Sequence, residues 1–565
     1  MKTTPILITA VALLAGACQT GTPDRGQVAA PSQPNILLVM YDDVTFGHWS
    51  CYGGEIPTPH LEHLADEGMI YHQAYTTAAA CTPSRYSIMT GQYPGRSVHE
   101  EFRSGNPETQ PYRIAWNTPI TERNLTLHEV MNRAGYFTGY VGKFHIGSPG
   151  AGRPEDNQQI PAIDPTLDPD TREADSLLEI YQEVLSKRVA ALTGADFSGS
   201  VQWANPEQLP LEAIRHHNLE YQVYGVKRFF DSLPAEQPFF LTVNSTALHG
   251  PNHYASLMTD PVYSAGGRIE ALRDMMPDRS SVFERLYDMG MPYGDGVEDH
   301  VNHYHSGIIY MDDQLGAILD MLKAEGLKEN TLVIVTADHN IEPGKSTVYE
   351  RGVNVPFLVR WPGRVLPATE SYDRVQFVDF LPAFAELGGV DIPGEVQVDG
   401  RSFVRDLASP VLNDERMLYF EEGYTRGVSD GRFKYIAMRF PQPVLDSLEA
   451  GVTNRISHMG SARSLFGSIA MNYHPGYFAS DQLYDLENDP YEQHNLAFDP
   501  DYSGKLEEMR QALDEVLSTF DHPFPLEANG YMAAPSYTRA AKEARVLGTD
   551  WIPWWNRELD YPPGQ

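Results

Sequence analysis

Four short runs of largely apolar residues constrain the fold of this chain more than any other feature of its sequence. They span residues 34–41, 136–141, 239–243 and 331–336. A strand buried on both faces of a parallel sheet carries a continuous apolar run, whereas a strand with one face in water alternates apolar and polar residues. Helical apolar patterns at 125–134 and 309–322 precede two of the runs. This alternation predicts an α/β fold with a large, doubly wound, mostly parallel sheet sandwiched by helices.

Pairs of potential metal ligands follow two of the predicted strands at the point where each strand ends. Asp42 and Asp43 follow the first run, and Asp338 and His339 follow the last. In an open α/β sheet the carboxyl ends of the strands converge on a ligand crevice. Adjacent carboxylates repel each other, and a divalent cation relieves that repulsion. Either pair alone is more typical of an exposed loop, but two pairs at two strand ends predict a metal site.

The composition excludes several classes of protein. Asp and Glu outnumber Lys and Arg by 76 to 42, which leaves a formal net charge of −34. Such an acidic surface repels the phosphates of a nucleic acid, although a local basic pocket can still bind a small anionic substrate. Hydrophobic residues make up 42% of the chain, which excludes a disordered protein. Three cysteines in 565 residues exclude a disulfide scaffold.

The N-terminus has the features of an export signal. Residues 1–17 join a positive start to an apolar run that suits a signal peptide but is shorter than the roughly 20 residues that span a bilayer. Small residues then precede Cys18, which resembles the lipobox of bacterial lipoproteins, whose cysteine is lipidated. We expect an exported lipoprotein of the periplasm or cell surface, anchored by lipid to a membrane such as the outer membrane, with 18–33 as a tether. The alternative is an ordinary signal peptide cut nearby.

The remaining sequence divides into a large and a smaller domain. After residue 410 the pattern changes to short strands separated by turns, which indicates an antiparallel sheet. An amphipathic helix is expected at 504–519. The expected parts are a catalytic domain at 34–410, a C-terminal antiparallel subdomain at 411–530, and an aromatic tail at 531–565.

Three features outside the predicted strands bear on substrate binding. Two polar stretches, 148–210 and 252–300, are too long for ordinary connections, so they predict functional lids or mobile loops, with short helices of their own. Trp551, Trp554 and Trp555 in the tail have two interpretations. Aromatic faces stack on sugar rings, but these side chains are at least as typical of a tail packed against the protein body.

The segment Cys81-Thr82-Pro83-Ser84-Arg85 carries the most specific signal in the sequence. A five-residue pattern with four fixed positions is rare by chance. It resembles the signature of the formylglycine-dependent, type I sulfatases of the alkaline phosphatase-like superfamily, in the manner of an exported bacterial glycan sulfatase. Gln92, Asn340 and Asn354 depart from the family's usual residues. Other segments that resemble the family's motifs are 89–94, 142–147, 247–251, 336–339, 345–352 and 483–497.

The resemblance implies a specific nucleophile and a specific cofactor. In this family a maturation enzyme oxidises the motif cysteine, so Cys81 would become formylglycine (3-oxoalanine). One hydroxyl of the hydrated aldehyde attacks sulfur, and the other later expels sulfate as the aldehyde re-forms. The resemblance also implies one calcium ion, whose ligands would be Asp42, Asp43, Asp338 and His339.

By the same resemblance, five further residues supply positive charge and proton transfer. Arg85 would orient and stabilise the hydrated aldehyde, and Lys143 and Lys345 would neutralise the sulfate oxygens. His249 would protonate the leaving oxygen, and His145 would accept the proton of the hydrate when sulfate leaves. Taken one at a time, such residues are more often surface lysines and structural histidines.

The predicted activity is therefore removal of sulfate from a carbohydrate by a sulfuric ester hydrolase. The expected partners are a sulfated poly- or oligosaccharide, the formylglycine-generating maturation enzyme and a membrane reached through the lipid anchor, with no nucleic acid. Two alternatives stay open. The chain could hydrolyse phosphate or phosphonate esters, as relatives in the same superfamily do. It could also be an inactive, tethered glycan-binding lipoprotein.

Overall fold

The computed structural model of the chain describes residues 33–108, 110–148, 158–341, 343–407, 416–450, 456–460, 470–471 and 473–527. From Pro34 onward these residues pack as one compact unit. Several predictions fall outside the described residues: the signal peptide, the lipidated Cys18, the domain boundary at 410–411 and the aromatic tail with its three tryptophans. They stay predictions. None of the described helices is long and apolar enough to cross a membrane.

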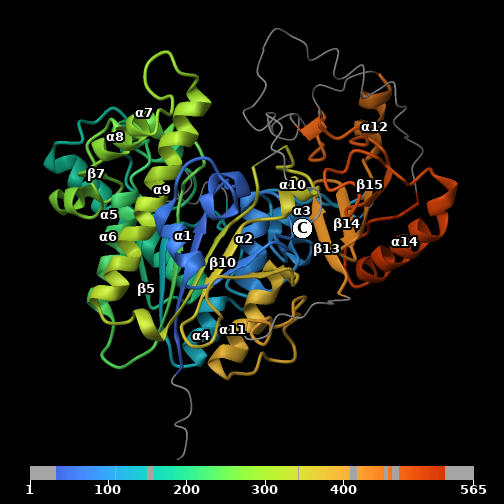
Figure 1. The fold of residues 1–565 in the computed structure, drawn as a ribbon, viewed down its shortest axis with the longest axis horizontal. Helices are drawn as coiled ribbons and strands as arrows, with labels where there is room; N and C mark the ends of the chain where they lie inside the picture. Colours follow the sequence, from blue (N-terminus) through green and yellow to red (C-terminus); the bar gives the residue numbers. More distant parts are fainter. Residues whose placement is uncertain are drawn as a thin grey trace, which may run out of the picture. The chain divides into compact units, whose positions relative to one another are not determined.

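An eight-stranded sheet runs through the large domain in the order β11-β2-β10-β9-β1-β6-β4-β5 (Figure 1). All neighbouring pairs are parallel except the two that involve β10. The four apolar runs form β1, β4, β6 and β9, which are adjacent in the sheet, so the expected large, mostly parallel α/β sheet is confirmed. The strands are β1 (Asn35–Tyr41), β2 (Met69–Tyr71), β4 (Phe137–Lys143), β5 (Phe197–Gln202), β6 (Phe239–Asn244), β9 (Thr331–Ala337), β10 (Phe357–Arg360) and β11 (Thr369–Ser371).

The register of the central strands brings polar residues to one edge of the sheet. Met40 of β1 lies opposite both Asn244 of β6 and Thr336 of β9. The chain therefore leaves these three parallel strands at the same level. Just beyond them, the backbone N–H of Asp338 donates to the carbonyl oxygen of Tyr41 at 2.9 Å. Residues that follow three different strands consequently face one another, which is the arrangement expected for a ligand site in an open sheet.

Helices pack against the sheet in two groups (Figure 1). One group contains α1 (Pro59–Asp66), α6 (Leu219–Ser232) and α9 (Asp299–Ala324), and the other contains α2 (Cys81–Thr90), α4 (Leu127–Arg133) and α11 (Phe380–Gly388). Helix α9 begins ten residues before the predicted 309–322, at Asp299. Its first turns are rich in histidine and other polar residues, so the apolar pattern did not reveal them.

The two long polar stretches contain more regular structure than their composition predicted. The first includes α5 (Arg172–Thr193) and strand β5, and the second includes α7 (His253–Leu257) and α8 (Ser280–Asp288). Thr171 caps the start of α5 by accepting a hydrogen bond from the N–H of Ala174, and Gly194 at φ 75° ends it. The buried side of α5 carries Leu178, Leu185 and Val189 at helical spacing. The first stretch therefore includes a long helix packed on the edge strand β5.

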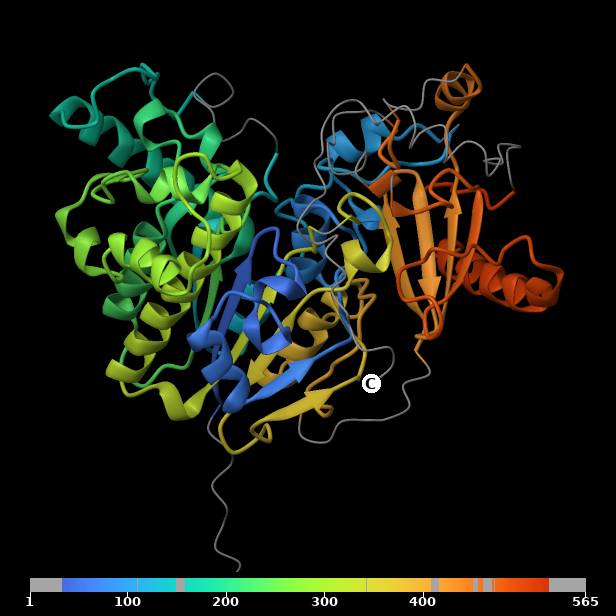
Figure 2. The ribbon, with the colours of Figure 1, turned by 45° about the horizontal axis from the view of Figure 1, so that its top comes forward.

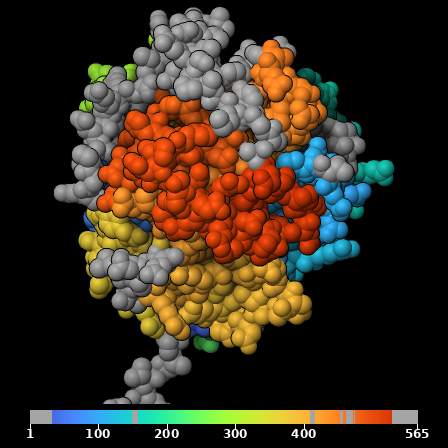
Figure 3. Space-filling view, turned by 90° about the vertical axis from the view of Figure 1, so that its right-hand side faces the viewer, coloured from blue at the N-terminus to red at the C-terminus, as the bar shows by residue number. Residues whose placement is uncertain are grey.

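The C-terminal region forms a separate antiparallel sheet, as predicted (Figure 2). Its order is β13 (Leu418–Glu422), β14 (Thr425–Ser429), β15 (Phe433–Met438) and β16 (Asp481–Asp485). Helix α14 (Ser503–Leu517) packs on β14 and β15 and buries Met509 and Leu513. Figure 3 shows that the red part of the chain, which includes this helix, covers much of one face of the molecule. The backbone N–H of Glu421 donates to the carbonyl of Thr77 at 2.9 Å, which joins this sheet to the large domain.

Candidate active site

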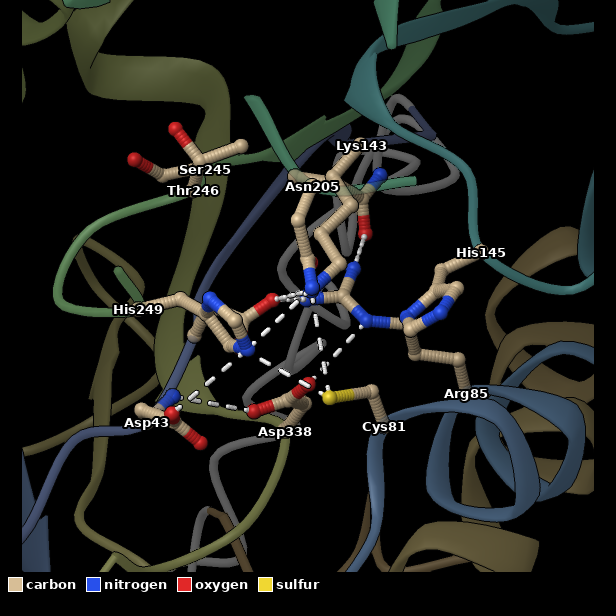
Figure 4. Close-up of polar contacts among 12 residues, drawn as sticks. Asp43, Cys81, Arg85, Lys143, His145, Asn205, Ser245, Thr246, His249 and Asp338 are labelled. Atoms are coloured by element: carbon tan, nitrogen blue, oxygen red, sulfur yellow. Dashed lines mark hydrogen bonds and ion pairs between the residues drawn. The ribbon is translucent and has the colours of Figure 1, made fainter. Parts of the chain in front are cut away.

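The cysteine of the most specific motif is the first residue of helix α2 and is buried, with 2% of its surface exposed. Residues three and four positions further along a helix lie on the same face. The motif spacing therefore places Ser84 and Arg85 on the same face of α2 as Cys81, and Figure 4 shows Arg85 beside Cys81. The hydroxyl of Ser84 donates to the carbonyl of Asp338, and that of Thr82 donates to the carbonyl of His145 at 2.8 Å. These bonds fix the first turn of α2 against the strand ends.

Arg85 is a buried fork that binds three acceptors at once. Its Nε lies 3.1 Å from Asp338 Oδ2, and its Nη2 lies 3.1 Å from Asp42 Oδ2. Its Nη1 donates to Asn244 Oδ1, also at 3.1 Å. Only the planar guanidinium offers donors in several fixed directions, so a lysine could not make the same set of bonds. Arg85 thus holds two carboxylates from two different strand ends in fixed positions around Cys81.

All four predicted metal ligands lie in this cluster, and all four are buried. One oxygen or nitrogen of Asp42, Asp338 and His339 lies within 4.8 Å of the others and of Cys81 Sγ. Asp43 Oδ1 is 3.4 Å from His339 Nε2, and the N–H of Asp43 donates to Asp338 Oδ1 at 3.3 Å. Asp43 adopts a φ of 60°, in the left-handed region that non-glycine residues rarely occupy. Such backbone conformations concentrate at functional sites.

Both predicted lysines are buried and pair with these carboxylates. Lys143 binds Asp42, and its Nζ is 3.8 Å from Cys81 Sγ. Lys345 Nζ lies 2.5 and 2.8 Å from the two oxygens of Asp43. Burial alone would raise the pKa of both carboxyls, but the lysines outweigh it, so the pKa of Asp42 lies well below its ordinary value and that of Asp43 falls to about 2.

The charges and donor types of this cluster fit one divalent cation. Three carboxylates face three cationic side chains, so the protein alone leaves the cluster close to neutral. A divalent cation among the carboxylates would make it positive, as the binding of a sulfate ester requires. Carboxylate oxygens are the ligands that calcium prefers. Two overlapping groups of side chains could hold an ion: one contains Asp42, Cys81, Asp338 and His339, and the other contains Asp42, Asp43 and His249.

The two histidines of the prediction lie on opposite sides of the cluster. His249 follows β6, keeps 20% of its side chain exposed, and has Nε2 3.9 Å from Asp43 Oδ2. His145 follows β4 at a φ of 51°, and its Nδ1 has no hydrogen-bond partner among the described residues. Burial, followed by the charge of Lys143, holds the pKa of His145 well below its ordinary value. His249 is thus the more accessible of the two, and His145 is held neutral.

Two asparagines belong to the site although the sequence did not point to them. Asn244, the last residue of β6, accepts a hydrogen bond from Arg85, and Asn205 Nδ2 lies 3.2 Å from His249 Nε2 (Figure 4). Asn244 could have been found from its position. It is the last residue of an apolar strand, and Asp42 directly follows the last residue of another. Nothing in the sequence around Asn205 distinguishes it from other loop asparagines. The structure brings it to the site through the segment that follows β5.

The side chain of Cys81 is a poor nucleophile as a thiol. Burial raises its pKa well above the ordinary value, and the charge of Asp42 adds to that effect. Only the thiolate is a strong nucleophile, so an unmodified Cys81 would be largely inert. Cationic and acidic groups nonetheless surround its Sγ, at 3.3 Å from His339 Nε2, 3.7 Å from Asp42 Oδ1 and 3.8 Å from Lys143 Nζ.

Comparison with known proteins agrees with this chemistry. The chain is 25% identical to N-acetylgalactosamine-6-O-sulfatase of Bacteroides thetaiotaomicron over 87% of its length and 94% of the relative. It is 24% identical to an ulvan-active sulfatase of Formosa agariphila, over 87% and 76% respectively. It is 27% identical to human arylsulfatase A, over 86% and 88%. The similarity thus covers most of each protein.

Solved structures share the same fold. One from a study of glycosaminoglycan metabolism by Bacteroides thetaiotaomicron aligns with a TM-score of 0.58 at 20% identity, over 86% of this chain and 99% of that one. Another, in complex with its substrate D-glucosamine-2-N,6-O-disulfate, aligns with a TM-score of 0.54 at 17% identity, over 88% and 100%. A model of the family described as Sulfatase matches residues 34–390, which is more than half of the chain. The chain therefore belongs to the sulfatase family, whose enzymes hydrolyse sulfate esters.

Proposed function

We propose that this sulfatase removes sulfate from a sulfated carbohydrate with a nucleophile derived from Cys81. The observation that carries the proposal is the position of Cys81 at the first turn of α2, where its Sγ faces Asp42, Lys143 and His339. Oxidation to formylglycine would replace the inert thiol by an aldehyde, whose hydrate supplies the attacking hydroxyl. Because Cys81 is 2% exposed, the maturation enzyme would have to act before this region folds.

The proposed metal is one calcium ion held by Asp42, Asp43, Asp338 and His339. A bound calcium ion would supply a Lewis acid that favours ionisation of the hydrate and binds a sulfate oxygen. The role of the protein is to hold the side chains of these ligands in position. Arg85 bridges Asp42 and Asp338, and Lys345 binds Asp43, so the carboxylates are held in position before any ion arrives.

The cationic side chains have a second task toward the substrate. The sulfuryl group carries negative charge on its oxygens throughout the reaction, as a phosphoryl group does. Lys143 is close enough to Cys81 to contact an ester that reacts there, and Lys345 binds both oxygens of Asp43. A cation held by Asp42 and Asp43 would compete with Lys143 and Lys345 for these carboxylates, and would weaken the pairing of both ammonium groups. They can then bind sulfate oxygens without a change in the fold.

Two histidines would move the protons. His249, partly exposed and 3.9 Å from Asp43 Oδ2, is placed to protonate the oxygen of the departing alcohol. His145, neutral because burial lowers its pKa, is suited to accept a proton from the hydrate when sulfate leaves. The hydroxyl of Thr82 and the carbonyl of His145 are bonded, which holds His145 close to the first turn of α2.

The substrate class follows from relatives and from the expected route of export. The relatives named above act, by their names, on N-acetylgalactosamine-6-sulfate and on ulvan. We infer a sulfated poly- or oligosaccharide outside the cytoplasm as the substrate of this chain. The predicted signal peptide and lipidated Cys18 would place the enzyme in the periplasm or at the cell surface, where such polymers are encountered.

The decisive test determines the chemical form of residue 81 by mass spectrometry and measures sulfate release by the same protein. Protein made with the maturation enzyme should contain a tryptic peptide in which residue 81 is an aldehyde, and it should release sulfate from 4-nitrophenyl sulfate and from sulfated disaccharides. Cys81→Ala should fold and show no turnover. Full activity with a plain thiol at residue 81 would refute the nucleophile, and faster hydrolysis of 4-nitrophenyl phosphate would favour a phosphate ester hydrolase. Tight binding of sulfated polymer without turnover would favour a glycan-binding lipoprotein.

A further inference from the structure

Three histidines lie behind the loop that carries His249, and the sequence motifs select none of them. His217 precedes α6, His253 begins α7, and His303 lies on α9. The rings of His217 and His253 stack with their centroids 3.9 Å apart, and the centroids of His253 and His303 are 4.7 Å apart. His217 and His253 are completely buried. None of the three contacts Cys81 or the proposed metal ligands in any hydrogen bond among the described residues.

Two of these histidines donate to successive backbone carbonyls of the loop. His217 Nε2 lies 2.8 Å from the carbonyl oxygen of His249 and 3.0 Å from that of Pro251. His303 Nε2 lies 2.7 Å from the carbonyl oxygen of Leu248. A carbonyl oxygen only accepts hydrogen bonds, so both Nε2 atoms must carry the proton. The tautomers of His217 and His303 are thereby fixed by their partners.

The Nδ1 atoms of the three rings make hydrogen bonds that agree with these tautomers. Burial lowers the pKa of all three histidines, that of His303 to about 4, so each ring is neutral. The Nδ1 atoms of His217 and His303 accept, whereas Nε2 of His253 has no hydrogen-bond partner among the described residues. His217 Nδ1 accepts from the hydroxyl of Thr246 at 2.9 Å. His303 Nδ1 accepts from Nδ1–H of His253 at 3.0 Å and from its backbone N–H at 3.3 Å. The Nε2 protons of His217 and His303 are therefore directed at the loop. The Thr246 hydroxyl proton is directed at His217, and the Nδ1 proton of His253 is directed at His303.

Helix α9 approaches the loop closely because of a glycine. Gly307 lies one turn after His303 on the same face of α9. A Cβ atom at this position would lie 2.7 Å from Cδ2 of Leu248 and 2.9 Å from Cγ of His253. Any larger residue would displace the helix or the loop. The absence of a side chain at residue 307 thus allows His303 to reach the carbonyl of Leu248.

We propose that His217 and His303 are positioning residues that hold the backbone of Leu248 and His249, and through it the ring of His249. The ring itself has few contacts: Asn205 lies at 3.2 Å from Nε2, and the carbonyl of Gly250 lies at 3.0 Å from Nδ1. Its direction therefore depends on how firmly the backbone is held. A displacement of about 1 Å in a reacting group can lower a rate about a hundredfold. The inference rests on the proposed role of His249 as the acid for the leaving oxygen.

The test uses the dependence of kcat/KM on the leaving group. The matured, calcium-loaded enzyme would be assayed with substituted phenyl sulfates from 4-nitrophenyl to unsubstituted phenyl, since a poor leaving group needs the acid and a good one does not. His217→Leu and His303→Leu remove the donors. They should lose about tenfold to a hundredfold in kcat/KM on phenyl sulfate and less than about threefold on 4-nitrophenyl sulfate. His217→Gln and His303→Gln keep an N–H near the Nε2 position and should recover most of the loss.

Three further variants make the outcome interpretable. His128→Leu is the matched control. His128 lies on α4, away from the loop that carries His249, and is also buried. Its Nε2 lies 3.1 Å from the carbonyl oxygen of Gly139. It should lower stability with no leaving-group dependence. Thr246→Val removes only the hydroxyl that orients His217, and it should give the same dependence more weakly even if the leucine variants fail to fold. His249→Ala should give the same dependence more strongly.

The possible results separate the inference from the function on which it rests. If His249→Ala lowers kcat/KM equally for every ester, His249 is not the acid and the proposed function fails at that residue. If His249→Ala shows the dependence while the leucine variants and Thr246→Val lower all esters equally, the positioning role is refuted. Failure of the glutamine variants to recover activity, with the leucine variants folded, would also refute it.

Discussion

Two buried clusters of charge in this molecule have similar chemistry and different consequences. One surrounds Cys81. In the other, Lys434 of β15 binds Glu350 and Glu492 with Nζ–O distances of 2.8 and 3.3 Å. Glu492 also accepts a hydrogen bond from the backbone N–H of Glu350 at 2.8 Å. This second cluster joins the short helix α10 (Glu350–Val353) of the large domain to the C-terminal sheet.

The clusters differ in what their cations can do. The ammonium of Lys434 is completely buried and faces two carboxylates and the ring of Phe420, with its Nζ 4.9 Å from the ring centroid. Among the described residues, these three groups are its polar and aromatic partners. Lys143 and Lys345 pair with carboxylates that a divalent cation would also bind, beside the partly exposed His249. A buried ion pair thus stabilises the fold in one place and supplies exchangeable charge in the other.

The largest effect is expected from Arg85→Lys. The substitution keeps one positive charge but cannot bind Asp42, Asp338 and Asn244 together, so both carboxylates and the residue at position 81 lose their fixed arrangement. Loss of one preorganised donor typically costs about 10²- to 10³-fold in kcat, and we expect at least the lower figure with 4-nitrophenyl sulfate.

Arg279→Lys is the matched control for this substitution. Arg279 is also buried and forked, and its Nε and Nη2 each lie 2.7 Å from an oxygen of Glu220, in a network that joins α6 to Tyr310 of α9. This control should lower the unfolding temperature and leave kcat/KM of the folded enzyme nearly unchanged. Wild-type turnover by Arg85→Lys would show that the fork has no part in catalysis.

Lys434→Met is expected to lower the stability of the protein and to leave its activity nearly unchanged, in contrast to Arg85→Lys. It leaves Glu350 and Glu492 buried without their cation, and removal of one partner from a buried ion pair typically costs about 3–5 kcal/mol. The free energy of unfolding, from urea titration, should fall by this order. The kcat/KM of the protein that remains folded should change less than about threefold. A stable but inactive variant would mean that this cluster also acts on the active site.

Much of this architecture could be predicted from the sequence because the signals are local. Continuous apolar runs identified the four adjacent strands, and the motif at 81–85 identified the family. The fold and the enzyme class are confirmed. The pairings of Lys143 with Asp42 and of Lys345 with Asp43 were not predicted, because they join residues about one hundred and three hundred positions apart.

The missed residues share a physical reason. Asn205, His217 and His303 act through contacts that exist only after several elements have packed, and each is an ordinary polar residue in its local sequence. The first turns of α9 were missed for a related reason. They carry polar residues that bind backbone groups of neighbouring segments, so the helix has no apolar stripe there. Periodicity finds helices that pack through apolar contacts and overlooks those that pack through hydrogen bonds.

Removal of the proposed calcium ion should abolish activity while leaving the fold intact. Lys143, Lys345 and Arg85 already neutralise the carboxylates, so the protein without metal does not hold three unpaired charges. A ligand present at about 100 times its dissociation constant stabilises a protein by about 2.7 kcal/mol. We expect EGTA to lower the free energy of unfolding by no more than this amount, with sulfate release restored by added calcium. Complete unfolding in EGTA would show that the ion, rather than the lysines, holds the cluster together.

The smallest effect concerns pH and tests the second cluster directly. Burial raises the pKa of Glu492 from 4.5 to about 7, although Lys434 opposes this. Because the folded protein keeps this proton to higher pH than the unfolded chain, the contribution of Glu492 to stability is complete below pH 4.5 and is lost as pH rises to about 7.

Glu492→Gln imitates the protonated form, so its free energy of unfolding should fall less than that of the wild type across this range, as measured by urea titration. The titration of one shifted group amounts to a few kcal/mol at most. Identical pH profiles would mean that Lys434 keeps Glu492 ionised, and the cluster would then hold two charged carboxylates on one ammonium group.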